Sequence, residues 1–79
     1  MHPLKDKYVV VLCANYIYCG TLEEVAVDRV TLLDPSIIYE TGDWSADKWK
    51  DAQRLPTNRA YLERSGVESF FEVQRGEKR

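Results

Sequence analysis

The stretch that decides the fold is YCGTLEEVAVDRVTLLD, which runs from Tyr18 to Asp34. It belongs to two extended runs, Tyr16–Val25 and Arg29–Asp34, which are joined by the turn sequence AVD. Gly20 interrupts the first run, and a glycine inside a strand is typical of a bend or bulge. The stretch therefore predicts an antiparallel hairpin whose first strand curves sharply, as a small β-barrel requires.

Further strands are predicted on both sides of this hairpin. The β-branched run Tyr8–Cys13 precedes it, and Ser36–Glu40 resumes extended character after Pro35, a residue that implies a strand edge or break. Thr57–Gly66 and Val67–Gln74 supply the last two strands. Short strands with tight turns at regular spacing predict a mainly β fold, a small five-stranded barrel.

The segment between the third and fourth predicted strands changes character. Ser45 is a good N-cap for a helix over Ala46–Arg54, which would end before Pro56. Trp44 precedes this cap and Trp49 follows it at the spacing of a hydrophobic staple. We therefore expect a short helix inserted between strands three and four.

Length and charge limit the possible functions. The 79 residues form one domain, 1–79, in which residues 1–6 and 75–79 are expected to be flexible. A net charge of −2 provides no global basic field to attract nucleic acid. The polar opening MHPLKDK does not resemble a signal peptide, and no stretch approaches the roughly 20 apolar residues of a membrane span. We expect a cytoplasmic protein with no membrane partner.

The residue types that perform catalysis or bind metals are sparse. The chain has two cysteines, Cys13 and Cys19, and one histidine, His2, which are too few and too scattered for a four-ligand metal site. Glu23 and Glu24 are adjacent in a strand and point to opposite faces, so they make a poor acid–base pair. The sequence predicts free thiols in a reducing compartment, no catalytic residues, no metal and no cofactor.

The spacing of the hairpin residues resembles a known family. Gly20 is followed by Leu22, Val25 and the pair Leu33-Asp34, the pattern of the Sm-like small β-barrels and in particular of the short Sm-like proteins of tailed phages and bacteria. The resemblance covers about Tyr8 to Val73. It implies an SH3-like barrel that self-assembles into a homo-oligomeric ring inside a bacterium or a phage-infected host cell.

Single-stranded RNA or DNA is the partner that this resemblance implies, but the usual contact residues are replaced. The positions of the family's loop aspartate and base-reading asparagine are Ala26 and Val30, which cannot form those hydrogen bonds. The family's Arg-Gly pair is matched only loosely, by Arg64-Ser65-Gly66. The candidate nucleic-acid contacts are therefore Arg29, Arg64 and Tyr61. The alternative, which residues of these types more often follow, is a solvated face for the arginines and a half-buried strand position for the tyrosine.

The last two strands carry the candidate assembly interface. Phe70 and Phe71 are adjacent, so one can enter the core while the other stays exposed unless something covers it. Pairing of this strand with the fourth strand of a second copy would cover it. The predicted interface residues are Tyr61, Leu62, Phe70 and Phe71. Coverage by the inserted helix is the alternative.

A monomeric SH3-like adaptor is the alternative function. Such a barrel would hold a peptide or protein partner with Trp44, Trp49 and Tyr61. The five tyrosines of the chain, Tyr8, Tyr16, Tyr18, Tyr39 and Tyr61, form either a stacking platform or a set of half-buried strand residues.

Overall fold

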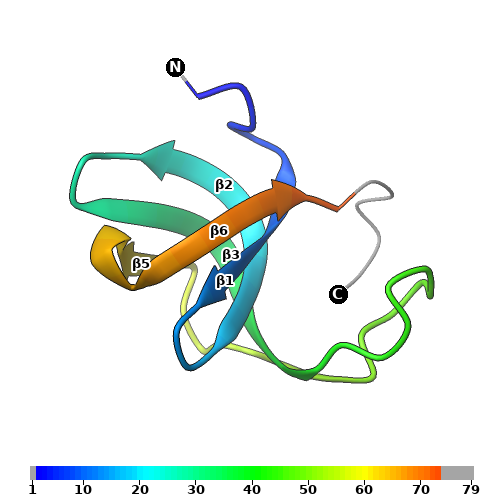
Figure 1. Cartoon of the computed structure of the whole chain (residues 1–79). Helices are drawn as coiled ribbons and strands as arrows, with labels where there is room; N and C mark the ends of the chain where they lie inside the picture. The colour runs from blue at the N-terminus through cyan, green and yellow to red at the C-terminus, as the bar shows by residue number, and fades with distance from the viewer. Residues whose placement is uncertain (1, 74–79) are drawn as a thin grey trace.

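The centre of the fold is the antiparallel pair of β2 (Ile17–Val25) and β3 (Arg29–Glu40). The computed structural model describes residues 2–73. Its other elements are β1 (Tyr8–Cys13), β4 (Asp51–Arg54), β5 (Arg59–Glu63), the 3-10 turn η1 (Arg64–Gly66) and β6 (Val67–Glu72). The mainly β prediction is confirmed. The strands form one six-stranded antiparallel sheet in the order β4-β3-β2-β1-β6, with β5 on β3, and this sheet is not closed into a barrel (Figure 1).

Strand β3 pairs with two different strands along its second edge. Its first half, Arg29–Leu33, pairs with β5, and its second half, Ser36–Glu40, pairs with β4. Asp34 lies between the halves with a φ of 47°, and the ladder to β2 changes register there. A proline cannot donate a ladder hydrogen bond, so Pro35 is accommodated at this irregularity. The predicted break at Pro35 is therefore a bulge within one continuous strand.

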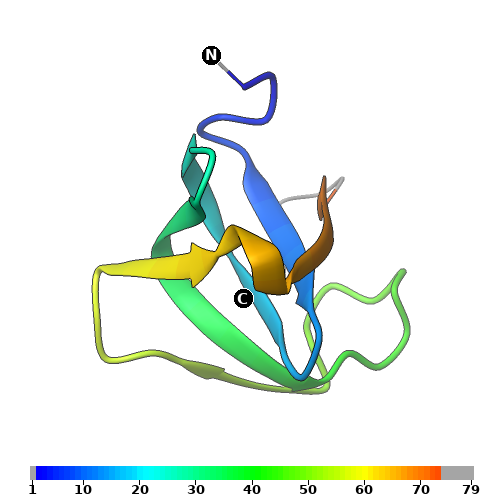
Figure 2. The same ribbon diagram turned by 60° about the vertical axis from the view of Figure 1, so that its left-hand side comes forward.

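Gly20 lies opposite this bulge, where β2 and β3 approach most closely. A Cβ atom at Gly20 would lie 2.8 Å from the Leu33 carbonyl oxygen and 3.3 Å from Pro35 Cα. Both obstacles belong to the backbone, so no side-chain rotation removes them. The absence of a side chain at this position allows β2 to curve over β3, as Figure 2 shows.

The sheet has an apolar core on each face. Curling of the strands encloses the inner core, which consists of Val9, Val11, Leu22, Val30 and Leu32. Partly buried Leu62 from β5 and Phe70 from β6 pack against it. The outer core consists of Val10, Cys19, Ile38 and Trp49. Strand β1 contributes to both cores because successive residues point to opposite faces, which explains its uninterrupted run of valines.

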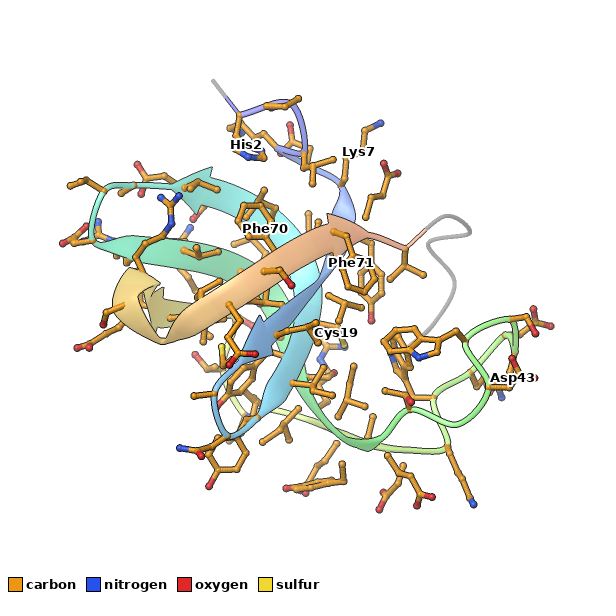
Figure 3. The ribbon with its side chains drawn as sticks, viewed as in Figure 1. His2, Lys7, Cys19, Asp43, Phe70 and Phe71 are labelled. Carbon is orange, nitrogen blue, oxygen red and sulfur yellow. The ribbon has the colours of Figure 1, made fainter. Side chains whose placement is uncertain are left out.

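The helix predicted over Ala46–Arg54 is wrong. Residues 44–50 form turns and bends, and Asp51–Arg54 is β4, hydrogen-bonded to β3. The side chain of Asp43, at the far end of this loop in Figure 3, accepts hydrogen bonds from the backbone N–H of Ser45 at 2.8 Å and its hydroxyl at 2.7 Å. Ladder bonds to the second half of β3 outweigh a short, marginal helix.

The N-terminal segment before β1 contacts the sheet. Residues 2–6 form turns, in which the Asp6 N–H donates to the Leu22 carbonyl at 2.7 Å. Leu4 packs against the inner core, and the His2 ring lies 5.3 Å from that of Phe70. The flexibility predicted for residues 75–79 concerns a segment outside the described residues.

The close approach at Gly20 gives a stability prediction. We expect Gly20→Ala to lower the free energy of unfolding by about 1–3 kcal/mol, since the added methyl must displace backbone. Gly66→Ala is the matched control, because a Cβ there has no heavy atom within 4 Å. The control should be neutral or stabilising by up to about 1 kcal/mol. Urea denaturation measures both, and equal effects would contradict this account of the bend.

Candidate functional site

A depression between the β2–β3 turn and η1 brings together the three predicted nucleic-acid contacts. Arg29, Arg64 and Tyr61 all line it. The remaining lining residues, which the sequence analysis did not single out, are Val27, Asp28, Glu63 and Ser65. The β2–β3 turn and η1 are far apart in sequence. The pairing of β5 with β3 brings them together.

Arg29 and Tyr61 form the first half of this depression. Arg29 begins β3, and its guanidinium carbon lies 5.5 Å from the centre of the Tyr61 ring, within cation–π distance. The same guanidinium lies 3.8 Å from a Glu24 carboxylate oxygen and 4.0 Å from an Asp28 carboxylate oxygen. These are loose, exposed ion pairs of small energy. The Arg29 side chain can therefore be recruited by a ligand at modest cost.

Arg64 has a structural role in the second half of the depression. Its Nη1 donates a 2.9 Å hydrogen bond to the Ala26 carbonyl, and its backbone N–H donates a 3.0 Å bond to the Asp28 carbonyl. These two bonds fix η1 against the β2–β3 turn. Arg64 thus uses part of its donor capacity to shape the depression that it also lines.

The depression is close to electrically balanced. Its two arginines, Arg29 and Arg64, are matched by the carboxylates of Asp28 and Glu63. A third arginine, Arg59 of β5, is held by Glu23 through bonds of 2.8 and 2.9 Å, and this pairing raises the pKa of the Arg59 guanidinium. A polyanion would therefore meet a balanced rather than a strongly basic surface.

The four predicted interface residues divide between core and surface. Phe70 and Leu62 pack against the inner core. Phe71 points to the opposite side of β6 and is 38% exposed, with its ring 5.9 Å from that of Trp44 (Figure 3). Tyr61 is 58% exposed. The exposed phenylalanine is thus Phe71, and a loop residue rather than a helix lies against it.

The aromatic trio of the adaptor alternative is not assembled. Trp49 is buried in the outer core, and Trp44 meets it edge-on at 5.6 Å. Tyr61 instead borders the depression with Arg29. Three other tyrosines do gather: Tyr16 and Tyr18 lie 6.2 Å apart, and Tyr39 is close enough to influence the pKa of Tyr18. Their clustering was not predicted, because the pairing of the end of β3 with the start of β2 was not predicted.

The two thiols lie on opposite faces of the sheet. Cys13 packs against the inner core, and Cys19 is fully buried in the outer core. The Tyr8 hydroxyl donates to Cys19 Sγ at 3.0 Å. Burial raises the pKa of both thiols, and the hydrogen bonds on Cys19 only partly oppose that effect. Both cysteines are free thiols of low reactivity.

The described residues contain no cluster of three metal-ligating side chains. Nor does any helix among the described residues have the length and apolar character needed to cross a membrane. No protein-family model matches the chain, and no curated protein matches it in sequence.

The raised thiol pKa values predict a loss of stability at alkaline pH. Cys13 and Cys19 hold their protons more tightly in the folded protein than at their ordinary pKa near 9.0. The unfolded chain therefore releases these protons first as the pH rises, which favours unfolding. We expect the free energy of unfolding to fall between about pH 8 and pH 10. Urea denaturation followed by tryptophan fluorescence measures this fall, which Cys19→Ala should make shallower. A flat or rising profile would contradict the assignment.

Proposed function

We propose that this chain is a non-enzymatic Sm-like protein, of phage or bacterial origin, that self-assembles into a homo-oligomeric ring. In the proposed contact, β5 of one copy pairs with β6 of the next. The observation that carries this proposal is that β5 and β6 each have an open strand edge and each bear an exposed aromatic side chain. Among residues 2–73, β5 pairs only with β3 and β6 pairs only with β1.

Unpaired strand edges attract further strands. Each open edge leaves backbone N–H and C=O groups available for a ladder with another chain. Tyr61 on β5 and Phe71 on β6 would add cross-strand aromatic contacts to such a ladder. The two strands have similar lengths, Arg59–Glu63 and Val67–Glu72, so their edges match over most of their extent.

Two different edges on one chain favour a closed assembly of several copies. A contact between unlike surfaces is heterologous, so each copy keeps one edge open for the next. Closure by rotation yields a ring in which the β5 and β6 edges of every copy are paired. A chain of 79 residues also has little interior of its own, and association is a common way to bury more apolar surface.

The positions of the motif residues support the Sm-like resemblance. Gly20 lies against the Leu33 carbonyl at the bend, so the two halves of the motif are in direct contact. Leu22 is fully buried in the inner core, and Val25 packs against that core. Asp34 takes the positive φ of the bulge and binds Arg54 at 2.9 Å. These contacts are what supports the resemblance: Gly20 of the first half of the motif touches the second half, and Leu22 and Val25 contribute to the inner core.

The assembly proposal predicts different outcomes for the two phenylalanines. The wild-type protein should be an oligomer at micromolar concentration, by native mass spectrometry and light scattering. Phe71→Glu should give a folded monomer, because it places a charge on the proposed contact. Phe70→Glu should unfold the chain, because it buries a charge in the inner core.

A second variant separates assembly from local packing. Trp44→Ala removes the ring against Phe71 but leaves both strand edges intact, so it should stay oligomeric. A monomeric wild-type protein, or a Phe71→Glu variant of unchanged mass, would refute pairing through β6.

Binding of single-stranded nucleic acid is a second candidate function. The gathering of Arg29, Arg64 and Tyr61 into one depression favours it, since a base can stack on the tyrosine while the arginines contact phosphate. The carboxylates of Asp28 and Glu63 oppose it. An assembled ring would repeat this depression around its axis, which increases avidity without new contacts.

A salt series tests this candidate. Oligouridine binding by gel shift should weaken with salt, and Arg29→Gln should weaken it further while reducing the logarithmic salt slope by about one unit per site. Arg54→Gln is the matched control, since Arg54 binds Asp34 away from the depression. Absent or salt-insensitive binding would eliminate the nucleic-acid candidate and leave the assembly proposal unaffected.

A further inference from the structure

A second concave surface, here called the outer-face cavity, lies on the side of the sheet that carries the outer core. It has a volume of about 260 Å³ and is lined by Tyr8 of β1, Asp34 and Ser36 of β3, and Ala52 and Arg54 of β4. None of these lining residues belongs to β5 or β6, so the cavity is separate from the strand edges proposed for assembly. At the roughly 30 Å³ that a water molecule occupies in the liquid, the cavity has room for a small organic molecule.

The register of the strands places polar side chains in this cavity. Cys19 pairs with Ser36, and Ser36 pairs with Arg54, so these positions form a row across β2, β3 and β4. Side chains in such a row share one face of the sheet, and Cys19 belongs to the outer core. Ser36 is only 9% exposed and lies at the floor, whereas the Arg54 side chain is 66% exposed and lies at the rim. The Tyr8 hydroxyl, 3.0 Å from Cys19 Sγ, stands on the β1 side.

Backbone hydrogen bonds hold the charged rim of the cavity in place. The Asp34 N–H donates to the Asn58 carbonyl at 2.9 Å, and the Leu55 N–H donates to the Pro35 carbonyl at 2.9 Å. These two bonds fix the bulge of β3 to the segment that joins β4 to β5. The rim is thus formed in advance, and a ligand needs little rearrangement to bind there.

One positive and one negative charge lie side by side at the rim. Arg54 Nη2 is 2.9 Å from Asp34 Oδ1, and the two side chains are 66% and 58% exposed. An exposed pair of this kind is of small energy, and the contact uses one guanidinium donor and one carboxylate oxygen, so both groups retain capacity for a ligand. Asp34 would oppose a purely anionic ligand, and Arg54 would oppose a purely cationic one.

We propose that the outer-face cavity binds a free α-amino acid in its zwitterionic form. The ligand carboxylate pairs with Arg54, and the ligand ammonium pairs with Asp34 and can donate to the Ser36 hydroxyl. The side group of the ligand lies between the Tyr8 ring and the Ala52 methyl, which favours a small apolar side chain.

This arrangement selects a free amino acid over a peptide. A peptide terminus carries only one of the two charged groups, whereas a free amino acid carries both on a single carbon and can satisfy both sides of the rim. The binding function is additional to self-assembly and does not depend on it, because β1, β3 and β4 build the cavity within one chain.

The test titrates the full chain with L-valine and follows the backbone amide chemical shifts. Saturable changes are expected at Ser36, Ala52 and Arg54. Isovalerate lacks the ammonium of valine and isobutylamine lacks the carboxylate, so each should bind about tenfold more weakly or worse. Glycine has no side group to place between Tyr8 and Ala52, so it should bind several-fold more weakly than valine.

Variants at the rim should change which of the two partial ligands is preferred. Asp34→Asn removes the carboxylate charge but keeps a residue type that tolerates the φ of 47°, so isovalerate should then bind more tightly than isobutylamine. Arg54→Gln should give the opposite preference, and both variants should weaken valine binding by about tenfold. Lys50→Gln is the matched control and should leave valine binding unchanged, because Lys50 forms an equally exposed ion pair with Glu40 outside the cavity.

The comparison of valine with isovalerate and isobutylamine uses the wild-type protein, so it decides the matter even if a rim variant fails to fold. The proposal is overturned if valine causes no saturable shift changes, or if the changes lie away from the cavity. It is also overturned if either partial ligand binds the wild-type chain as tightly as valine, or if Lys50→Gln weakens valine binding as much as Arg54→Gln.

Discussion

The fold depends on one close backbone contact, that of Gly20 with the bulge of β3. A side chain at Gly20 would collide with the Leu33 carbonyl, so the curvature of β2 requires a glycine at this position. The bulge at Asp34–Pro35 ends the segment of β3 that pairs with β5 and begins the segment that pairs with β4. Curvature and change of partner therefore occur at the same place, and β4 and β5 take their positions from it.

This arrangement explains why a small chain exposes so many aromatic side chains. The inner core is enclosed by the curled sheet, while the outer core is covered by a loop that inserts Trp49. Neither covering is complete. The end of β3 extends beyond β5 and presents Tyr39, Tyr16 is exposed just before β2, and β6 presents Phe71 beside Trp44. The exposed aromatic side chains thus lie where the sheet extends beyond the strands and the loop that cover it.

The sequence predicted those parts of the fold that local chemistry controls. The hairpin, the bend at Gly20 and the strand of valines follow from residue types that have few alternatives. The segment Asp51–Arg54 was misassigned because its residues, DAQR, favour a helix locally, and only the unpaired second half of β3 explains its extended form. For the site, Arg29, Arg64 and Tyr61 could be named in advance, but the carboxylates that balance the two arginines required the pairing of β3 with β5.

The valine run of β1 has a consequence for how the chain finds its native pairing. In a sheet with one apolar and one polar face, a register shift of one residue is unfavourable because it exposes the apolar side chains to water. Here both faces of β1 are buried in apolar surroundings, so this penalty is weak. Correct alignment must come from the tight turn at Cys13–Tyr16 and from the glycine that fits only beneath Leu33. We therefore expect misaligned hairpins to compete with the native pairing during folding.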